Sequence, residues 1–324
     1  MSKHLDILLL TALPASGKSE ARTYLASLSP EECHEHFGIG HTVQLDDFPY
    51  VHIMRLVSDE MTVRGHSGPY FRSSALPFRE PLDWGTLIEL MNEDYRDLVE
   101  KNQPKPDSAA LYMFDRLDRA RAVVGAPTVF ADMDPALKNE IAGALEDECR
   151  DLLDKKNAEH PDTLEGKTVV IEFARGGADG SAMPLVEPYG YGYSFAQLCP
   201  EILDKASILY IWVTPEESRR KNLHRTDPDD PGSILNHGVP AAVMYGDYGC
   251  DDMQWQLDNS GKPNTVKVER DGQTWNLPLG RFDNRQDLTT FIRDDLGDWK
   301  PADMAKLRAG MEDAFQKLHA ARGL

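Results

Sequence analysis

Positive charge is scarce in this chain of 324 residues: 35 Lys and Arg stand against 54 Asp and Glu, which gives a formal net charge of -19. Proteins that bind nucleic acid neutralise its phosphates with surplus Lys and Arg. The deficit therefore argues against nucleic acid as a partner. Small anionic ligands are still compatible with it, because they need only a local basic cluster.

Cysteines and long apolar stretches are also scarce. The cysteines, which form neither a C-x-x-C pair nor a disulfide-dense pattern, are Cys33, Cys149, Cys199 and Cys250. No apolar run approaches the roughly 20 residues that span a bilayer. The short run at the beginning of the sequence lacks a small-residue cleavage site. We therefore expect a soluble, reduced, cytoplasmic protein without a membrane partner.

The chain does contain short apolar runs of the kind that form buried parallel strands. Each is apolar enough to be covered on both faces, and three end at a polar or acidic residue. The runs occupy residues 5–11, 42–46, 168–173 and 208–213. In open α/β sheets ligands collect at the carboxyl ends of strands, so functional side chains are expected there.

Helices are predicted from apolar spacing and from capping residues, such as Ser29 ahead of Pro30. The expected helical segments begin near residue 18 and near residue 83, and include 135–156, 215–225, 287–295 and 301–319. Asp271 and Gly272 lie between β-like runs and predict a hairpin. Residues 50–84, rich in Arg, Gly, Pro and aromatics, are expected to form an irregular surface lobe.

The segment A-L-P-A-S-G-K-S at residues 12–19 matches the P-loop (Walker A) pattern, with Ala12 in place of the first Gly. An apolar strand precedes it and a helix follows. Backbone N–H groups of such a turn, together with the helix N-terminus, converge on phosphate oxygens. The residues predicted to bind the nucleotide are Ala15, Ser16, Gly17, Lys18 and Ser19. Lys18 is expected to reach the β- and γ-phosphates, and the Ser19 hydroxyl to ligate Mg²⁺.

On these residues the chain resembles the P-loop kinases of the nucleoside monophosphate kinase type, in the P-loop NTPase superfamily. They include small-molecule kinases of the gluconate, shikimate and adenylylsulfate sort. The resemblance rests on L-L-L-T-A-L-P-A-S-G-K-S, on the acid after the second strand and on a basic helix late in the chain. It implies a three-layer α/β core around a parallel sheet, with ATP and Mg²⁺ as cofactors. Residues 50–166 lie outside the resemblance.

Two acids, Asp46 and Asp47, follow the second strand and should reach the mouth of the phosphate site. In the kinases that the chain resembles, an acid here orients or deprotonates the acceptor hydroxyl, or holds Mg²⁺ through water. The strand register decides between Asp46 and Asp47, and Asp47 could equally cap the next turn. Glu172 ends the third strand, where the resemblance implies support for Mg²⁺. Arg175 follows it, and its guanidinium could bind an anionic substrate or form a surface ion pair.

The segment R-R-K-N-L-H-R at residues 219–225 is conspicuously basic for so acidic a chain. The resemblance implies a lid near residues 215–235, in which arginines stabilise the phosphoryl group in transfer. The candidates are Arg219, Arg220 and Arg225, although a solvated helix face paired with nearby acids fits the same pattern. The segment that contains Asp283 and Asn284 resembles the loop that packs beside adenine in these kinases. The pair Asp-Asn is equally a signal for a helix N-cap.

Together these features predict a core of residues 1–49 and 167–324, with a helical insertion at 50–166 that binds the acceptor. The leading hypothesis is an ATP- and Mg²⁺-dependent kinase for a small-molecule acceptor. A toxin-like kinase of nucleotide sugars falls within the same class. The alternative is a regulatory or NTP-hydrolysing module that acts through a protein partner. The identity of the acceptor, the base preference and the oligomeric state are not fixed by the sequence.

Overall fold

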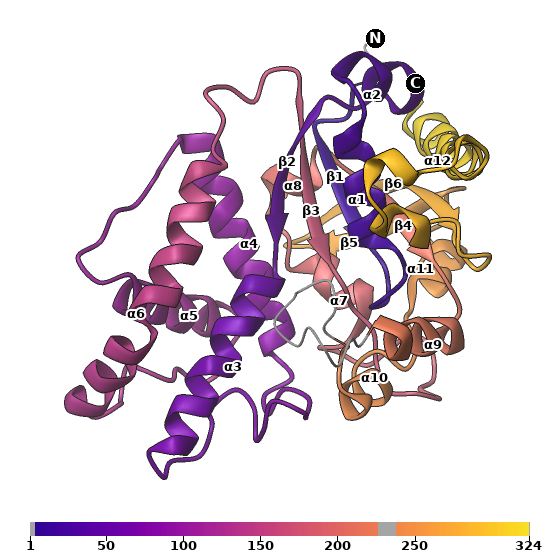
Figure 1. Ribbon diagram of the computed structural model, residues 1–324. Helices are drawn as coiled ribbons and strands as arrows, with labels where there is room; N and C mark the ends of the chain where they lie inside the picture. The colour runs from indigo at the N-terminus through magenta and orange to yellow at the C-terminus, as the bar shows by residue number, and fades with distance from the viewer. Residues whose placement is uncertain (1–3, 226–237, 324) are drawn as a thin grey trace.

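The computed structural model describes residues 4–225 and 238–323. The protein is a mixed α/β protein around a six-stranded sheet of order β2-β3-β1-β4-β6-β5 (Figure 1). The strands are β1 (Ile7–Thr11), β2 (His41–Asp46), β3 (Lys167–Phe173), β4 (Ala206–Trp212), β5 (Thr265–Arg270) and β6 (Gln273–Asp283). Five strands are parallel, and β5 is antiparallel to β6.

The four apolar runs of the sequence are the four strands β1 to β4, and no end differs by more than two residues from the prediction. Every residue of β1 is buried, as expected of a strand covered on both faces. β2 alternates between buried and less buried residues because it lies at the edge of the sheet. The hairpin is confirmed as well: Asp271 and Gly272 join β5 to β6 with φ values of 50° and 76°, as a tight two-residue turn requires.

One face of the sheet is covered by α1 (Lys18–Ser27), α2 (Pro30–Phe37) and α12 (Pro301–Arg322). Leu8 and Leu10 of β1 pack there in one cluster with Tyr24, Phe37 and Phe315. The prediction for the start of α2 is confirmed, because the Ser29 and Glu32 side chains form a reciprocal capping box.

The opposite face is covered by α7 (Gly190–Ala196) and α4 (Asp83–Glu100). Ile7 and Leu9 of β1 share a cluster with Leu87 and Phe195, and the same cluster continues into α5 (Ala109–Val123) and α6 (Pro135–Ala158). Figure 1 shows α4, α5 and α6 on the side of the sheet where β2 forms the edge. Residues 50–166 therefore share one continuous apolar core with the sheet.

The prediction of an irregular lobe at residues 50–84 is wrong for its first part, which is helix α3 (Phe48–Val63). Its buried residues Tyr50, Ile53, Met54 and Val57 recur at helical spacing. The abundance of Gly and Pro belongs only to the part after residue 63. The helix expected at 287–295 is also reduced, to the short 3-10 helix η1 (Thr290–Arg293).

The remaining helices are short or lie near the carboxyl ends of the strands. They are α8 (Pro200–Leu203), α9 (Pro215–Arg225), α10 (Ala241–Gly246), α11 (Met253–Asn259) and the 3-10 helix η2 (Leu296–Asp298). Among the helices of the described ranges, none has an apolar stretch long enough to cross a bilayer.

Candidate functional site

The loop of residues 12–17 leaves the carboxyl end of β1 at the middle of the sheet. From β1 the chain runs to β2 at one edge of the sheet, whereas from the neighbouring β4 it runs to β5 at the other edge. Ligands of open α/β sheets bind at such a switch point. In Figure 1 the loop lies at the lower end of the sheet, with α3 to its left and α9 to its right.

The loop adopts a conformation in which several backbone donors do not bind other backbone groups. Ala15 and Gly17 have φ values of 56° and 103°, and α1 begins at the next residue, Lys18. The backbone N–H groups of Ala15, Ser16 and Gly17 donate to no acceptor in the described part of the chain. The Ser16 hydroxyl is buried and has no hydrogen-bond partner there either. Successive N–H groups at a helix N-terminus form an anion-binding concavity.

Three side chains from distant parts of the chain hold the loop through its carbonyl groups. The Tyr191 hydroxyl of α7 donates to Ala12 O at 3.0 Å, and the Ser218 hydroxyl of α9 donates to Pro14 O at 2.7 Å. Asn284, which follows β6, donates to Ser16 O at 2.8 Å. Protein side chains thus bind the carbonyl groups of the loop, whereas its N–H groups have no acceptor among the described residues.

Gly17 is required by this packing as well as by its backbone angle. A Cβ atom at Gly17 would lie 2.5 Å from Thr289 Oγ1 and 2.6 Å from Asn284 Nδ2. Both atoms of the Asn284 amide form hydrogen bonds, because Nδ2 also donates to Thr289 Oγ1 and Oδ1 accepts from Leu288 N. The buried Asn284 therefore holds the loop in place, and we call it the brace of the loop. The neighbouring Asp283 is exposed and forms an ion pair with Arg285 at 2.8 Å.

Lys18, Glu172 and Asp46 meet beside the loop. The Lys18 Nζ atom is 3.6 Å from Glu172 Oε1, and Asp46 is the register partner of Glu172 across β2 and β3. Arg22 of α1 connects the two acids, with Nη1 at 3.1 Å from Glu172 Oε2 and 3.7 Å from Asp46 Oδ2. Ser19 is half-buried in the first turn of α1. Burial and the nearby Glu172 and Asp47 carboxylates raise the pKa of Asp46 to about 7.

These groups could support Mg²⁺ only together with a ligand. In the described ranges, no three or more His, Cys, Asp or Glu side chains are arranged to hold a metal ion by themselves. Mg²⁺ commonly binds through one or two carboxylates, water and substrate phosphates. Asp46, Glu172 and the Ser19 hydroxyl fit that incomplete protein coordination shell.

Asp47 has different surroundings from Asp46. Its carboxylate is buried and pairs with Arg175, with Nη1 at 2.6 Å from Oδ2. The Arg175 side chain is only 2% exposed and also donates to Ser194 Oγ at 3.0 Å and to Trp84 O at 3.3 Å. Substrate binding by Arg175 stays a prediction, because in this structure its donors bind protein atoms. Of the two strand-end acids, Asp46 is the more exposed, with 29% of its side chain accessible.

The predicted lid begins at the loop itself, because Ser218 anchors α9 to Pro14. The Nη1 atom of Arg219 is 3.3 Å from Asp179 Oδ1, and the Arg219 guanidinium lies 4.8 Å from the centre of the Tyr245 ring. Arg220 is half exposed and pairs with Glu217 at 2.6 Å. The side chain of Arg225 and residues 226–235 of the predicted lid lie outside the described residues.

A further cluster lies between α3 and the end of α10. Asp247 is only 3% exposed, and its carboxylate has no hydrogen bond or ion pair with any described residue. Burial raises its pKa to about 7, against the opposing charge of Arg55. Arg55 stacks at 4.3 Å on the Phe71 ring. Tyr248 packs edge-on against Trp84, at 5.6 Å between ring centres.

This second cluster is close to the strand-end acids, because Trp84 contacts both groups. The Arg175 guanidinium that pairs with Asp47 lies 5.0 Å from the Trp84 ring, and Tyr248 packs against the same ring. Asp247 directly precedes Tyr248 in the chain. No spacing or motif around Asp247 distinguishes it in the sequence from an ordinary acid at a helix end.

The comparisons with known proteins give no family for the chain. It matches no protein-family model and none of the curated proteins.

Proposed function

We propose that this protein is an ATP-dependent phosphotransferase of the P-loop type, which moves the γ-phosphoryl group to a small-molecule acceptor with the help of Mg²⁺. The observation that carries the proposal is the loop after β1. Three consecutive backbone N–H groups, at Ala15, Ser16 and Gly17 next to Lys18, have no acceptor among the residues that the structure describes. Buried or crowded donors without partners cost free energy, which an anion at this position would relieve.

A nucleoside triphosphate suits this concavity better than a single monovalent anion. The N–H groups and the N-terminus of α1 would hold the β-phosphate, while Lys18 would leave Glu172 to contact the β- and γ-oxygens. The Ser19 hydroxyl would ligate Mg²⁺, with Asp46 and Glu172 close to its water ligands. The metal ion would neutralise charge on the phosphates as the phosphoryl group transfers.

Asp46 is the better candidate for orienting the acceptor. It ends β2 next to Glu172 and is partly accessible, whereas Asp47 is occupied by Arg175. A base must lie within hydrogen-bond reach of the acceptor hydroxyl to remove its proton. Arg219 and Arg220 follow the anchored Ser218 directly, so a rotation of α9 could bring a guanidinium to the γ-phosphate.

The acceptor would bind between α3 and α10, at Asp247 and Arg55. A buried carboxylate without a partner favours a ligand that donates hydrogen bonds through a hydroxyl or an ammonium group. Arg55 would contact an acidic or carbonyl group of the same molecule. Since Trp84 connects this cluster to Asp47, an acceptor held there would extend toward Asp46 and the γ-phosphate.

The test is a screen of a metabolite panel for ADP formation that depends on an added acceptor. Wild type should respond to at least one polyhydroxyl or amino compound, and Lys18→Ala should lose the response. The matched control is Lys267→Ala, on the exposed side of β5, which should retain it. ADP formation without any acceptor would favour an NTP-hydrolysing module, and full activity in Lys18→Ala would refute the assigned site.

A further inference from the structure

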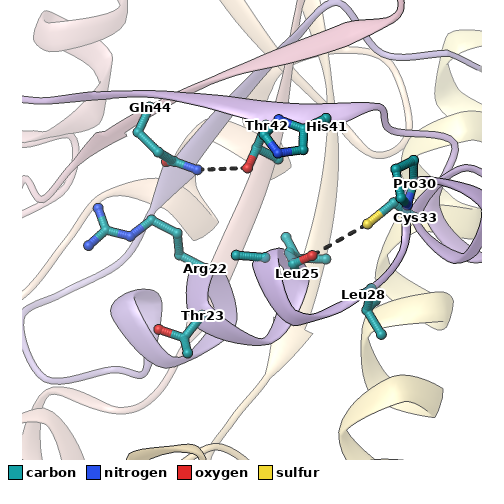
Figure 2. Close-up of a pocket in the computed structure, with 10 residues that line it drawn as sticks. Arg22, Thr23, Leu25, Leu28, Pro30, Cys33, His41, Thr42 and Gln44 are labelled. Carbon is teal, nitrogen blue, oxygen red and sulfur yellow. Dashed lines mark hydrogen bonds between the residues drawn. The ribbon is translucent and has the colours of Figure 1, made fainter. Parts of the chain in front are cut away.

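A hollow of about 340 Å³ lies between α1 and β2, on the face of the sheet covered by α1, α2 and α12. We call it the α1–β2 hollow. Its lining residues come from α1, α2, their connection and β2: Arg22, Thr23, Leu25, Ala26, Leu28, Pro30, Cys33, His41, Thr42 and Gln44. Figure 2 shows β2 along one side, α1 along the other and Cys33 with Pro30 at one end. Its size falls at the lower end of the range for small-ligand pockets.

The polar residues that line the hollow are Arg22, Thr23, His41, Thr42 and Gln44. Gln44 donates from Nε2 to Thr42 Oγ1 at 3.0 Å, but its Oε1 atom is buried and accepts no hydrogen bond from the described residues. Arg22 provides a cation at the end opposite Cys33 (Figure 2). Leu25 and Leu28 of the α1 segment lie on the same side and give the hollow an apolar wall (Figure 2).

We propose that the α1–β2 hollow binds a small carboxylic acid that has a short branched apolar side chain and a hydrogen-bond donor next to the carboxylate. The carboxylate would pair with Arg22, the donor would reach Gln44 Oε1, and the side chain would lie against Leu25 and Leu28. This is the chemistry of a 2-amino or 2-hydroxy acid. A guanidinium–carboxylate pair is charge-assisted and directional, so the acid should bind more tightly than its amide.

Such a ligand would act on the candidate functional site, because Arg22 belongs to both places. Its guanidinium lies between Glu172 and Asp46 at the carboxyl ends of β2 and β3. A carboxylate in the hollow would compete with these two acids for the guanidinium of Arg22. Occupation of the hollow would therefore change the charge beside Lys18, and nucleotide binding would change the affinity for the acid reciprocally.

The experiment is a calorimetric titration of the whole protein, without nucleotide, with L-leucine and with 2-hydroxy-4-methylpentanoate; leucinamide is the probe that lacks a carboxylate. At least one acid should bind saturably, and the amide at least about tenfold more weakly. Ala26→Trp should fill the hollow and weaken acid binding by about tenfold or more. Ser27→Trp, the next residue on α1 and outside the hollow, should leave acid binding unchanged.

Three results would overturn the proposed site: no saturable binding of either acid, equal binding of acid and amide, or unchanged binding in Ala26→Trp. Which of the two acids binds identifies the donor as an ammonium or a hydroxyl group. The effect through Arg22 is tested by titrating Mg-ATP with and without a saturating acid. An unchanged Mg-ATP affinity would refute that coupling. Because the first titrations contain no nucleotide, their outcome is independent of the proposed kinase activity.

Discussion

Asp247 has a buried carboxylate whose charge no described side chain pairs with. Burial raises its pKa from the ordinary value of 3.8 to about 7. Between these two pH values the folded protein binds more protons at this site than the unfolded chain does. The contribution of Asp247 to stability is therefore present below the lower value and is lost as the pH rises through about 7.

Asp247→Asn should remove this dependence, because an amide does not titrate. The free energy of unfolding of the variant, relative to wild type, should rise as the pH increases from about 4 to about 7. Urea unfolding at a series of pH values measures the difference, and other titrating groups cancel because both proteins have them. Asp132→Asn, at an exposed position, is the control. A difference that does not vary with pH would show that Asp247 has the same pKa in both states.

Arg175 and Asp47 form a buried pair in which each compensates the charge of the other. Arg175→Met leaves Asp47 buried without a partner and should lower the free energy of unfolding by about 3–5 kcal/mol. The double variant Arg175→Met/Asp47→Asn should recover part of this loss. Chemical denaturation measures both, with Arg72→Met at an exposed position as the control. Equal effects of the single and the control substitution would mean that the pair contributes nothing to stability.

Asp47 and Arg175 also show which properties of a single residue the sequence can predict. The sequence places Asp46 and Asp47 at the end of a strand, but it does not say which of them is accessible. That depends on Arg175, which follows a strand more than a hundred residues later. The distinction comes from the pairing of β2 with β3 and from the burial of Arg175 against Trp84, neither of which has a local sequence signal.

At the scale of elements, the loop after β1 depends on a brace that follows β6. Asn284→Ala would leave Ser16 O and Leu288 N without their partners and should cost about 2 kcal/mol of stability. Because the loop loses its brace, the affinity for Mg-ATP should also fall. Calorimetry and urea unfolding measure the two effects. Asn259→Ala, near the surface end of α11, is the matched control; equal ATP affinity in both variants would contradict the brace.

Elements with strong local signals could be predicted, and those defined by composition alone could not. The apolar runs of β1 to β4, the capping residues of α2 and the Asp271-Gly272 turn each specify their own structure. In residues 50–84 the Gly, Pro and Arg content obscured the helical spacing that begins at Tyr50. The segment at 287–295 has helical spacing, yet Asn284 and Thr289 are committed to the loop after β1, and only a short 3-10 helix forms.

At the scale of the whole molecule, residues 50–166 and the sheet share one apolar core. We expect the protein to unfold in a single cooperative transition, because exposing the helices of 50–166 also exposes one face of the sheet. Unfolding should therefore give coincident curves by far-ultraviolet circular dichroism and by tryptophan fluorescence, which reports on Trp84 of α4 together with the four tryptophans that follow residue 166. Two separated transitions would show that residues 50–166 form an independent folding unit.

Only part of the candidate site could be predicted from the sequence, because the rest is assembled from segments that are distant in the chain. The half proposed to bind phosphate is contiguous, at residues 12–19, so a single stretch of sequence contains its whole pattern. The other half brings together Arg55, Trp84, Asp247 and the ends of two strands, and only the tertiary structure makes them neighbours. The predicted role of residues 50–166 in acceptor binding depends on this arrangement.

The central claim, that a nucleoside triphosphate binds at residues 12–19, is tested most directly by calorimetric titration with Mg-ATP. Wild type and Lys267→Ala should bind one equivalent with equal affinity. Lys18→Ala should bind at least about tenfold more weakly, because it loses the charged contact to the β- and γ-phosphates. Equal binding by Lys18→Ala and wild type, or no binding by any of the three proteins, would contradict the claim.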